Sequence, residues 1–196
     1  MSDIRIGARN LGKTFPGGIE AVADVDLDIQ PGSVTALLGP TGCGKSTVLR
    51  MLGGLEVPTT GEVSVDPEIE VGFCFQDPRL LPWRDVRRNV ALPLELDRRP
   101  RPEIRERVDR QLRTVGLLDA AERLPAALSG GMRMRTAVAR SLVGDPELLL
   151  LDEPFGALDE VTRFRLDEEL ASLVRDGGPT VVIVTHSIAE AVFLAD

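Results

Sequence analysis

The sequence predicts an α/β fold with a mostly parallel sheet, an N-terminal antiparallel β portion and an inserted helical subdomain. Short apolar runs that suit buried parallel strands, at residues 34–38, 148–151 and 180–184, alternate with segments of helical periodicity. Residues 24–29 instead alternate apolar and acidic side chains, which is typical of a strand with one solvated face. In the middle of the chain, prolines, arginines and helical periodicity replace the strand pattern, which indicates the insertion.

The length and composition fit one folded domain. The chain has 196 residues, of which 43% are hydrophobic and 28% charged, so it is long enough to bury a core. Residues 1–76 and 145–196 are assigned to the α/β core, and residues 77–144 to the helical subdomain. The formal net charge of -8 argues against a nucleic-acid partner, because such partners select basic surfaces.

The compartment follows from what the sequence lacks. There is no positively charged start followed by a hydrophobic run, and no stretch approaches ~18 consecutive apolar residues. The protein is therefore expected in the cytoplasm, with any membrane link made through a partner. Cys43 and Cys74 have no metal-ligand spacing and suit a reducing compartment.

The remaining strands and helices follow from local patterns. Further strands are expected at residues 4–11, 62–65 and 71–75, and a glycine-rich turn at residues 11–18 carries Phe15. A helix in the insertion is predicted by apolar residues at helical spacing, namely Ile104, Val108, Leu112 and Val115. Pro102 near its start and Gly116 just after its end are typical helix boundaries.

A glycine-rich loop of the form G-x-x-x-x-G-K-[ST] joins the strand at residues 34–38 to a helix. Glycines let a backbone close around phosphate oxygens, and a helix N-terminus presents N–H groups to negative charge. The expected ATP-binding residues here are Gly39, Pro40, Thr41, Gly42, Cys43, Gly44, Lys45, Ser46 and Thr47. Lys45 would reach the β and γ phosphates, and Ser46 would ligate Mg²⁺. The alternative is a simple turn in which Lys45 is a solvated charge.

Other candidate residues follow the ends of predicted parallel strands, where ligands bind in open α/β sheets. Asp152 ends an aliphatic run and suits a metal site, and Glu153 beside it suits a general base. A helix-capping turn is the alternative for this pair, which the following Pro154 disfavours. His186, the single histidine, could contact a γ-phosphate or could be an ordinary core or surface residue. Gln76 follows another strand.

A second glycine motif starts a helix that is predicted to end near Val143. Ser129 is expected to cap this helix, and Gly130 and Gly131 leave its first N–H groups available to an anion. By itself this motif is only a plausible helix start. It lies 84 positions after Lys45 (129 minus 45), and a strand ending in an acidic pair follows it.

Together these motifs resemble the ATP-binding-cassette ATPases over essentially the whole chain, and they occur in family order. The resemblance implies catalytic roles for Glu153, His186 and Gln76, and a Mg²⁺ site of Ser46, Gln76 and Asp152. It also implies a dimer loop containing Asp159, and two subunits that face head to tail around ATP. In that arrangement Ser129, Gly130 and Gly131 of one subunit close the nucleotide held by the other. Phe15 is the candidate for stacking on adenine, with a core role as the alternative.

The stretch from Phe75 to Leu96, with Trp83 and Asn89, is similar to the nitrate, sulfonate and taurine importer branch. The resemblance implies a position on the inner face of the cell membrane, with residues 76–89 receiving a cytoplasmic helix of a transmembrane permease. An extracytoplasmic solute-binding protein would be an indirect partner. Trp83 could equally be a core residue of the helical subdomain.

The chain departs from the family at three points, the first being Met134 where glutamine is usual. The antiparallel portion is expected to be smaller than in the family, because the segment between Gly61 and Gln76 is shorter than the family's. The family continues past the position of Asp196, so part of its fold is expected to be missing, exposing Val192, Phe193 and Leu194.

Three other functions are alternatives to the importer subunit. A DNA-repair cassette would need a coiled coil between the two glycine motifs, for which 84 positions (129 minus 45) leave no room. An ATP-dependent phosphotransferase would need an acceptor site, and that function would not explain the second glycine motif at residues 129–131. A catalytically silent binding module remains an alternative.

Overall fold

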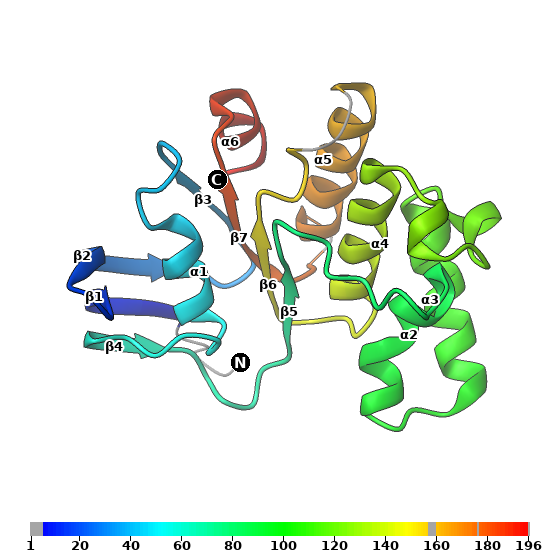
Figure 1. Cartoon of the computed structure of the whole chain (residues 1–196), viewed down its shortest axis with the longest axis horizontal. Helices are drawn as coiled ribbons and strands as arrows, with labels where there is room; N and C mark the ends of the chain where they lie inside the picture. Colours follow the sequence, from blue (N-terminus) through cyan, green and yellow to red (C-terminus); the bar gives the residue numbers. More distant parts are fainter. Residues whose placement is uncertain (1–5, 157–159, 176, 196) are drawn as a thin grey trace.

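The computed structural model describes residues 6–156, 160–175 and 177–195, which form two sheets flanked by helices (Figure 1). The strands are β1 (Ile6–Phe15), β2 (Ile19–Ile29), β3 (Val34–Leu38), β4 (Thr60–Ser64), β5 (Val71–Cys74), β6 (Leu148–Asp152) and β7 (Thr180–Thr185). The helices are α1 (Lys45–Leu52), α2 (Val86–Leu96), α3 (Arg101–Thr114), α4 (Gly130–Leu142), α5 (Glu160–Arg175) and α6 (Ile188–Leu194). Two short 3-10 turns lie between α3 and α4. The predicted fold class, with one parallel and one antiparallel sheet, is confirmed.

The larger sheet has the strand order β3-β7-β6-β5, and every neighbouring pair in it is parallel. Its strands therefore end along one edge, where Leu38 lies opposite Thr185 and Asp152 lies opposite Val184. Because the register is fixed by backbone hydrogen bonds, the segments that follow β3, β5, β6 and β7 leave the sheet at this common edge.

The parallel strands are buried on both faces, which explains their uninterrupted aliphatic sequences. Leu148 and Leu150 pack in one cluster with α1 and the antiparallel sheet. Leu149 and Leu151 point the opposite way, into a second cluster shared with α4 and α5. α1 and α4 consequently lie on opposite sides of the parallel sheet (Figure 1).

The smaller sheet is antiparallel, with the order β2-β1-β4, and it corrects two predicted boundaries. β1 does not end at Leu11 but continues to Phe15, so the predicted turn over residues 11–18 is in large part strand. Likewise β2 begins at Ile19, well before residue 24. Pairing between the two strands stabilises these extensions, which local sequence pattern could not show.

The helices α2, α3 and α4 pack together beside the parallel sheet (Figure 1). The predicted helix at α3 is confirmed, and Val108, Leu112 and Val115 are buried. Buried Asn89 of α2 holds the preceding loop, since its side chain accepts from the Leu81 N–H at 2.8 Å and donates to the Arg84 carbonyl at 2.8 Å.

Four apolar side chains were assigned by sequence to core or surface, with mixed outcomes. Trp83 is 71% exposed, so its interpretation as a core residue is wrong. Val192 and Phe193 on α6 are exposed as expected. Leu194 is only 4% exposed, because it faces the cluster shared with α5, and the expectation for it is wrong.

Candidate nucleotide site

The glycine-rich loop runs from the end of β3 into α1, as predicted. Gly44 stands at the helix N-cap with a φ of 96°, a left-handed conformation that favours glycine. A Cβ at this position would lie 2.2 Å from the Ala21 carbonyl oxygen, so Gly44 also permits close contact with β2. No side chain caps α1, which leaves its first N–H groups to face an approaching anion.

Lys45 lies folded over this loop. Its Nζ donates hydrogen bonds to the carbonyl oxygens of Gly39 and Pro40, both at 2.8 Å. The loop thereby places an ammonium group beside the bare N–H groups of the helix start, and the loop is open to solvent at Thr41, Gly42 and Cys43. This arrangement suits phosphate oxygens.

A buried hydroxyl–carboxylate pair lies at the base of the loop. The Ser46 Oγ donates to Asp152 Oδ1 at 2.7 Å, and Asp152 is fully buried. Its second oxygen, Oδ2, has no hydrogen-bond partner among the described residues; its nearest cation is Arg50, at 4.0 Å. An unpartnered buried carboxylate oxygen is costly, and hard oxygen donors of this kind are what Mg²⁺ prefers. The pair therefore fits a Mg²⁺ site.

Gln76 and His186 both contact the same carboxylate oxygen of Glu153, and each of these three residues follows the end of a different parallel strand. Gln76 Nε2 donates to Glu153 Oε2 at 3.2 Å, and His186 Nδ1 lies 3.5 Å from the same atom. The Glu153 side chain is 18% exposed and that of His186 is 60% exposed, so the carboxylate is held by its neighbours and remains partly open to solvent. Glu153 itself has a φ of 48°, and its N–H donates to the Val184 carbonyl at 3.0 Å.

The second glycine motif is not brought to the phosphate loop. Ser129 does cap α4, since its Oγ accepts from the Met132 N–H at 3.2 Å, which confirms the predicted cap. However, α4 and α1 lie on opposite sides of the parallel sheet (Figure 1). Within the described ranges, no hydrogen bond or ion pair joins Ser129, Gly130 or Gly131 to the loop.

Two other candidates have separate outcomes. Phe15 ends β1 and is half-buried, with the Lys13 Nζ 5.2 Å from its ring centre, and it belongs to neither buried cluster. The proposed dimer loop, including Asp159, falls at residues 157–159, which lie outside the described residues.

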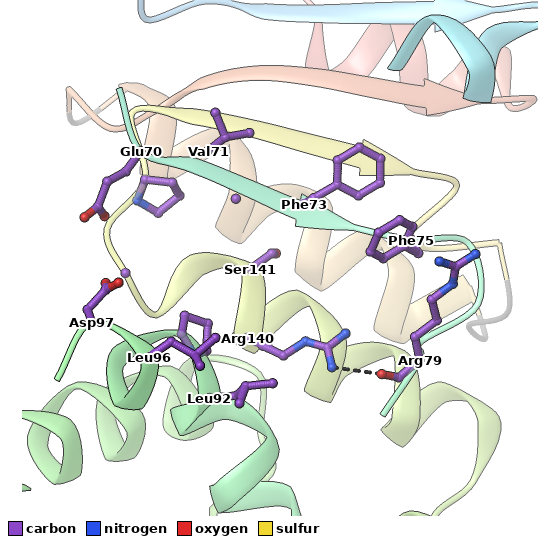
Figure 2. A pocket seen from close by; sticks show the side chains of 14 residues that line it. Glu70, Val71, Phe73, Phe75, Arg79, Leu92, Leu96, Asp97, Arg140 and Ser141 are labelled. Atoms are coloured by element: carbon purple, nitrogen blue, oxygen red, sulfur yellow. Dashed lines mark hydrogen bonds between the residues drawn. The ribbon is translucent and has the colours of Figure 1, made fainter. Parts of the chain in front are cut away.

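Sequence reasoning missed Arg140, which links α4 to the loop that carries Gln76. Its guanidinium donates to the carbonyl oxygens of Pro78 at 2.7 Å and Arg79 at 3.0 Å, and Figure 2 shows the bond to Arg79. Burial lowers the pKa of Arg140. An arginine among the apolar residues of the last turn of α4 was the available signal. Through these bonds Arg140 connects the last turn of α4 to the segment after β5.

A parallel sheet with a phosphate loop at its carboxyl edge, combined with an antiparallel sheet and a lateral helical layer, defines a cassette-type nucleotide-binding ATPase. Residues 22–156 match the ABC transporter family, and the chain belongs to that family. It is an ATP-binding-cassette ATPase.

Individual relatives are similar over nearly the whole chain. The chain is 47% identical to the aliphatic sulfonates import ATP-binding protein SsuB 1 of Xanthomonas axonopodis pv. citri (strain 306), covering 100% of this chain and 80% of that protein. It is 45% identical to the nitrate import ATP-binding protein NrtD of Synechococcus elongatus, covering 95% and 72%. Among solved structures, the dimeric post-hydrolysis state of the ATP-binding cassette MJ0796 bound to ADP and Pi matches with a TM-score of 0.88 at 34% identity, covering 96% of this chain and 90% of that one.

Proposed function

We propose that this chain is the subunit that hydrolyses ATP to energise an importer of nitrate, a sulfonate, taurine or a similar small solute. The observation that carries the catalytic part is the convergence of Gln76 and His186 on Glu153 Oε2, beside the buried Ser46–Asp152 pair. The solute class rests on relatives at 45% and 47% identity, which are named as nitrate and aliphatic sulfonate import proteins.

The phosphate loop is proposed to bind the triphosphate of ATP through residues 39–47. Lys45 lies close enough to its own loop to neutralise charge on the β and γ phosphates. Ser46, Gln76 and Asp152 would hold Mg²⁺, which when bound offsets the negative charge of the phosphate oxygens. The unpartnered Oδ2 of Asp152 supports this assignment, because metal binding would give that oxygen a favourable interaction.

Glu153 is proposed to accept a proton from the attacking water. Hydrolysis requires a group that orients water in line with the γ-phosphate, and a partly exposed carboxylate held by two neighbours meets this need. Gln76 orients the carboxylate through its amide. His186, more exposed than Glu153, is placed to contact the γ-phosphate as well as the carboxylate.

A second subunit is proposed to complete the site. α1 and α4 lie on opposite sides of one sheet, so the phosphate loop and the cap at Ser129 can share a nucleotide only between two chains. Ser129, Gly130 and Gly131 would then present N–H groups to the γ-phosphate held by the partner. Asp159 is proposed to lie at the same interface, and Phe15 to stack on adenine.

Contact with the membrane is proposed to be indirect. No helix of the described residues is long and apolar enough to cross a bilayer. Exposed Trp83 and the segment 76–89 would receive a cytoplasmic helix of a permease, next to a groove of about 520 Å³ that β5 forms with α2 and α4 (Figure 2). The extracytoplasmic solute-binding protein is an indirect partner. The net charge of -8 supports the absence of a nucleic-acid partner.

Glu153→Gln tests the proposal. The amide keeps the shape and the contacts of the side chain but cannot accept the proton, so turnover should fall by about 10²–10⁴-fold. ATP binding should persist, and an ATP-bound dimer should accumulate, as measured by phosphate release and size-exclusion chromatography with ATP. Glu147→Gln, at an exposed position before β6, is the matched control and should hydrolyse normally.

Two outcomes would contradict the assignment. Hydrolysis by Glu153→Gln at the parent rate would show that Glu153 is not the base. ATP binding without hydrolysis by the unsubstituted chain would favour the binding-module alternative.

A further inference from the structure

A cleft of about 830 Å³ lies between α2 and α3, on the helical part of the chain. Its lining is dominated by arginine, contributed by both helices and their connection: Arg87, Arg88, Arg99, Arg101 and Arg105. We call it the arginine cleft. Its floor is apolar, formed by Ala91 of α2 with Ile104 and Val108 of α3. Charged groups above an apolar floor are less screened than charges surrounded by water on all sides.

The two carboxylates that line the arginine cleft are already engaged. Glu95 pairs with Arg84, which does not line the cleft. Glu122 pairs with Arg87 at 3.2 Å, and Arg87 is also hydrogen-bonded to Asp109. Arg87 is thus held in place by protein. The carboxylates do not neutralise the other four arginines.

Those other four guanidinium groups are weakly paired or unpaired. Arg88 lies 3.7 Å from Asp85, and Arg99 lies 4.0 Å from Glu70 and 3.9 Å from Glu103, longer than hydrogen bonds. Within the described part of the chain, no ion pair involves Arg101 or Arg105.

The charge in the cleft opposes that of the whole chain. Five arginines less two glutamates leave three positive charges in the lining, in a chain with a net charge of -8. The start of α3 adds little to this excess, because Glu103 lies in the first turn of the helix and offsets the partial positive charge of its uncapped N–H groups. The four arginines other than Arg87 are exposed, so an anion that enters the cleft can reach several guanidinium groups at once.

We propose that the arginine cleft binds a phosphate-bearing polyanion. Guanidinium groups are always charged, and their planar donors match phosphate oxygens in pairs. Several of them around one hollow select a group with more than one negative charge. The phosphate could belong to a small soluble compound or to a lipid headgroup. No residue of the β3–α1 loop lines this cleft, so the proposed site is separate from the nucleotide site.

The test removes the two unpaired arginines and measures binding of inorganic pyrophosphate by calorimetry. All variants carry Lys45→Ala, which weakens the phosphate loop as a competing site. Arg101→Gln with Arg105→Gln should weaken pyrophosphate binding by about tenfold or more, because each loses charge-assisted hydrogen bonds. Arg113→Gln with Arg123→Gln removes the same charge from exposed positions that do not line the cleft, and should leave binding nearly unchanged.

A second arm separates the two sources of phosphate. Sedimentation is measured with phosphatidylcholine vesicles that contain or lack phosphatidic acid. Binding of pyrophosphate alone, lost in the cleft variant, supports a soluble ligand. Binding to phosphatidic acid vesicles, lost in the cleft variant, supports a lipid headgroup. Absence of both, or equal loss in the cleft and control variants, overturns the proposal. Circular dichroism and the melting temperature confirm that each variant is folded.

Discussion

Asp152 illustrates at the scale of one residue how a site is maintained at the expense of stability. Its buried side chain satisfies one oxygen through Ser46, while Oδ2 has no hydrogen-bond partner among the described residues. Asp152→Asn should weaken the Mg²⁺ dependence of ATP binding by about 10–100-fold, because Asp152 orients the Ser46 hydroxyl and supplies its charge. Nucleotide affinity without Mg²⁺ should stay near that of the parent. Titration of a fluorescent ATP analogue with and without Mg²⁺ measures both.

Asp119→Asn is the control for Asp152→Asn. Asp119 is exposed and distant from the phosphate loop in sequence, so Mg²⁺ should enhance binding as in the parent. An unchanged Mg²⁺ enhancement in Asp152→Asn would exclude a metal role for Asp152.

The identity of the residues at the strand ends was predictable, but their convergence was not. Apolar runs located β6 and β7, and with them Glu153 and His186 just beyond. That Gln76 and His186 meet the same oxygen of Glu153 depends on the register between β5, β6 and β7 and on the left-handed φ of 48° at Glu153. These are properties of pairing between distant segments, for which a single sequence carries no local signal.

At the scale of elements, the contact between β5 and α4 depends on Gly72. A Cβ at this position would lie 2.2 Å from the Ser141 carbonyl oxygen and 3.0 Å from Pro146. Gly72→Ala should therefore force β5 and α4 apart and lower the free energy of unfolding by about 1–3 kcal/mol. Urea unfolding followed by circular dichroism measures this loss.

Gly144→Ala is a matched control in the turn that follows α4. Its new Cβ would meet only the end of the Glu70 side chain, at 3.4 Å, which can move. The free energy of unfolding should then be unchanged or slightly raised, because alanine restricts the unfolded chain. Equal losses for the two variants would show that close packing at Gly72 is not the cause.

The interface between α5 and α6 is predicted to make stability depend on pH. Asp167 of α5 is buried, and burial, with the nearby charge of Glu190, raises its pKa to about 7, while Arg163 acts in the opposite direction. Because the folded state holds this proton more tightly than the unfolded state, the contribution to stability is full below about pH 4 and is lost as pH rises towards 7.

Asp167→Asn should remove this pH dependence. Relative to the parent, the variant should gain free energy of unfolding between about pH 4 and pH 7 and show a constant difference above that range. Urea unfolding at a series of pH values measures the difference. Glu168→Gln, at an exposed neighbouring position, should follow the parent curve. A parent curve that is flat from pH 5 to pH 8 would contradict the role of Asp167.

The boundaries of an element could be predicted where they depend on its own sequence. They could not be predicted where they depend on pairing between two strands. α3 was located correctly, since its apolar spacing, Pro102 and Gly116 all lie within it or at its ends. β1 was predicted too short because its pairing with β2 has register shifts. At these irregularities Asn10 and Asp24 have φ values of 46° and 48°, and their side chains are joined by a 3.0 Å hydrogen bond. Such bulges interrupt the alternation on which strand prediction depends.

For the molecule as a whole, the placement of the two glycine motifs is the strongest argument for a shared site. One chain carries the phosphate loop before α1 and the serine cap of α4 on opposite sides of its parallel sheet. A symmetric pair of chains facing head to tail would form two composite sites, each with a loop from one subunit and a cap from the other.

Mixing two inactive variants tests this arrangement directly. Lys45→Ala removes the charge that binds the phosphates, and Ser129→Arg places a bulky cation where the partner's nucleotide would be closed in. Neither homodimer contains an intact site. In the mixed dimer both defects fall in the same site, and the other site combines an intact loop with an intact cap. Phosphate release by the mixture should therefore exceed that of either variant alone. Circular dichroism checks that both variants are folded. If the mixture of folded variants is no more active than its components at any ratio, the two chains do not form a shared site.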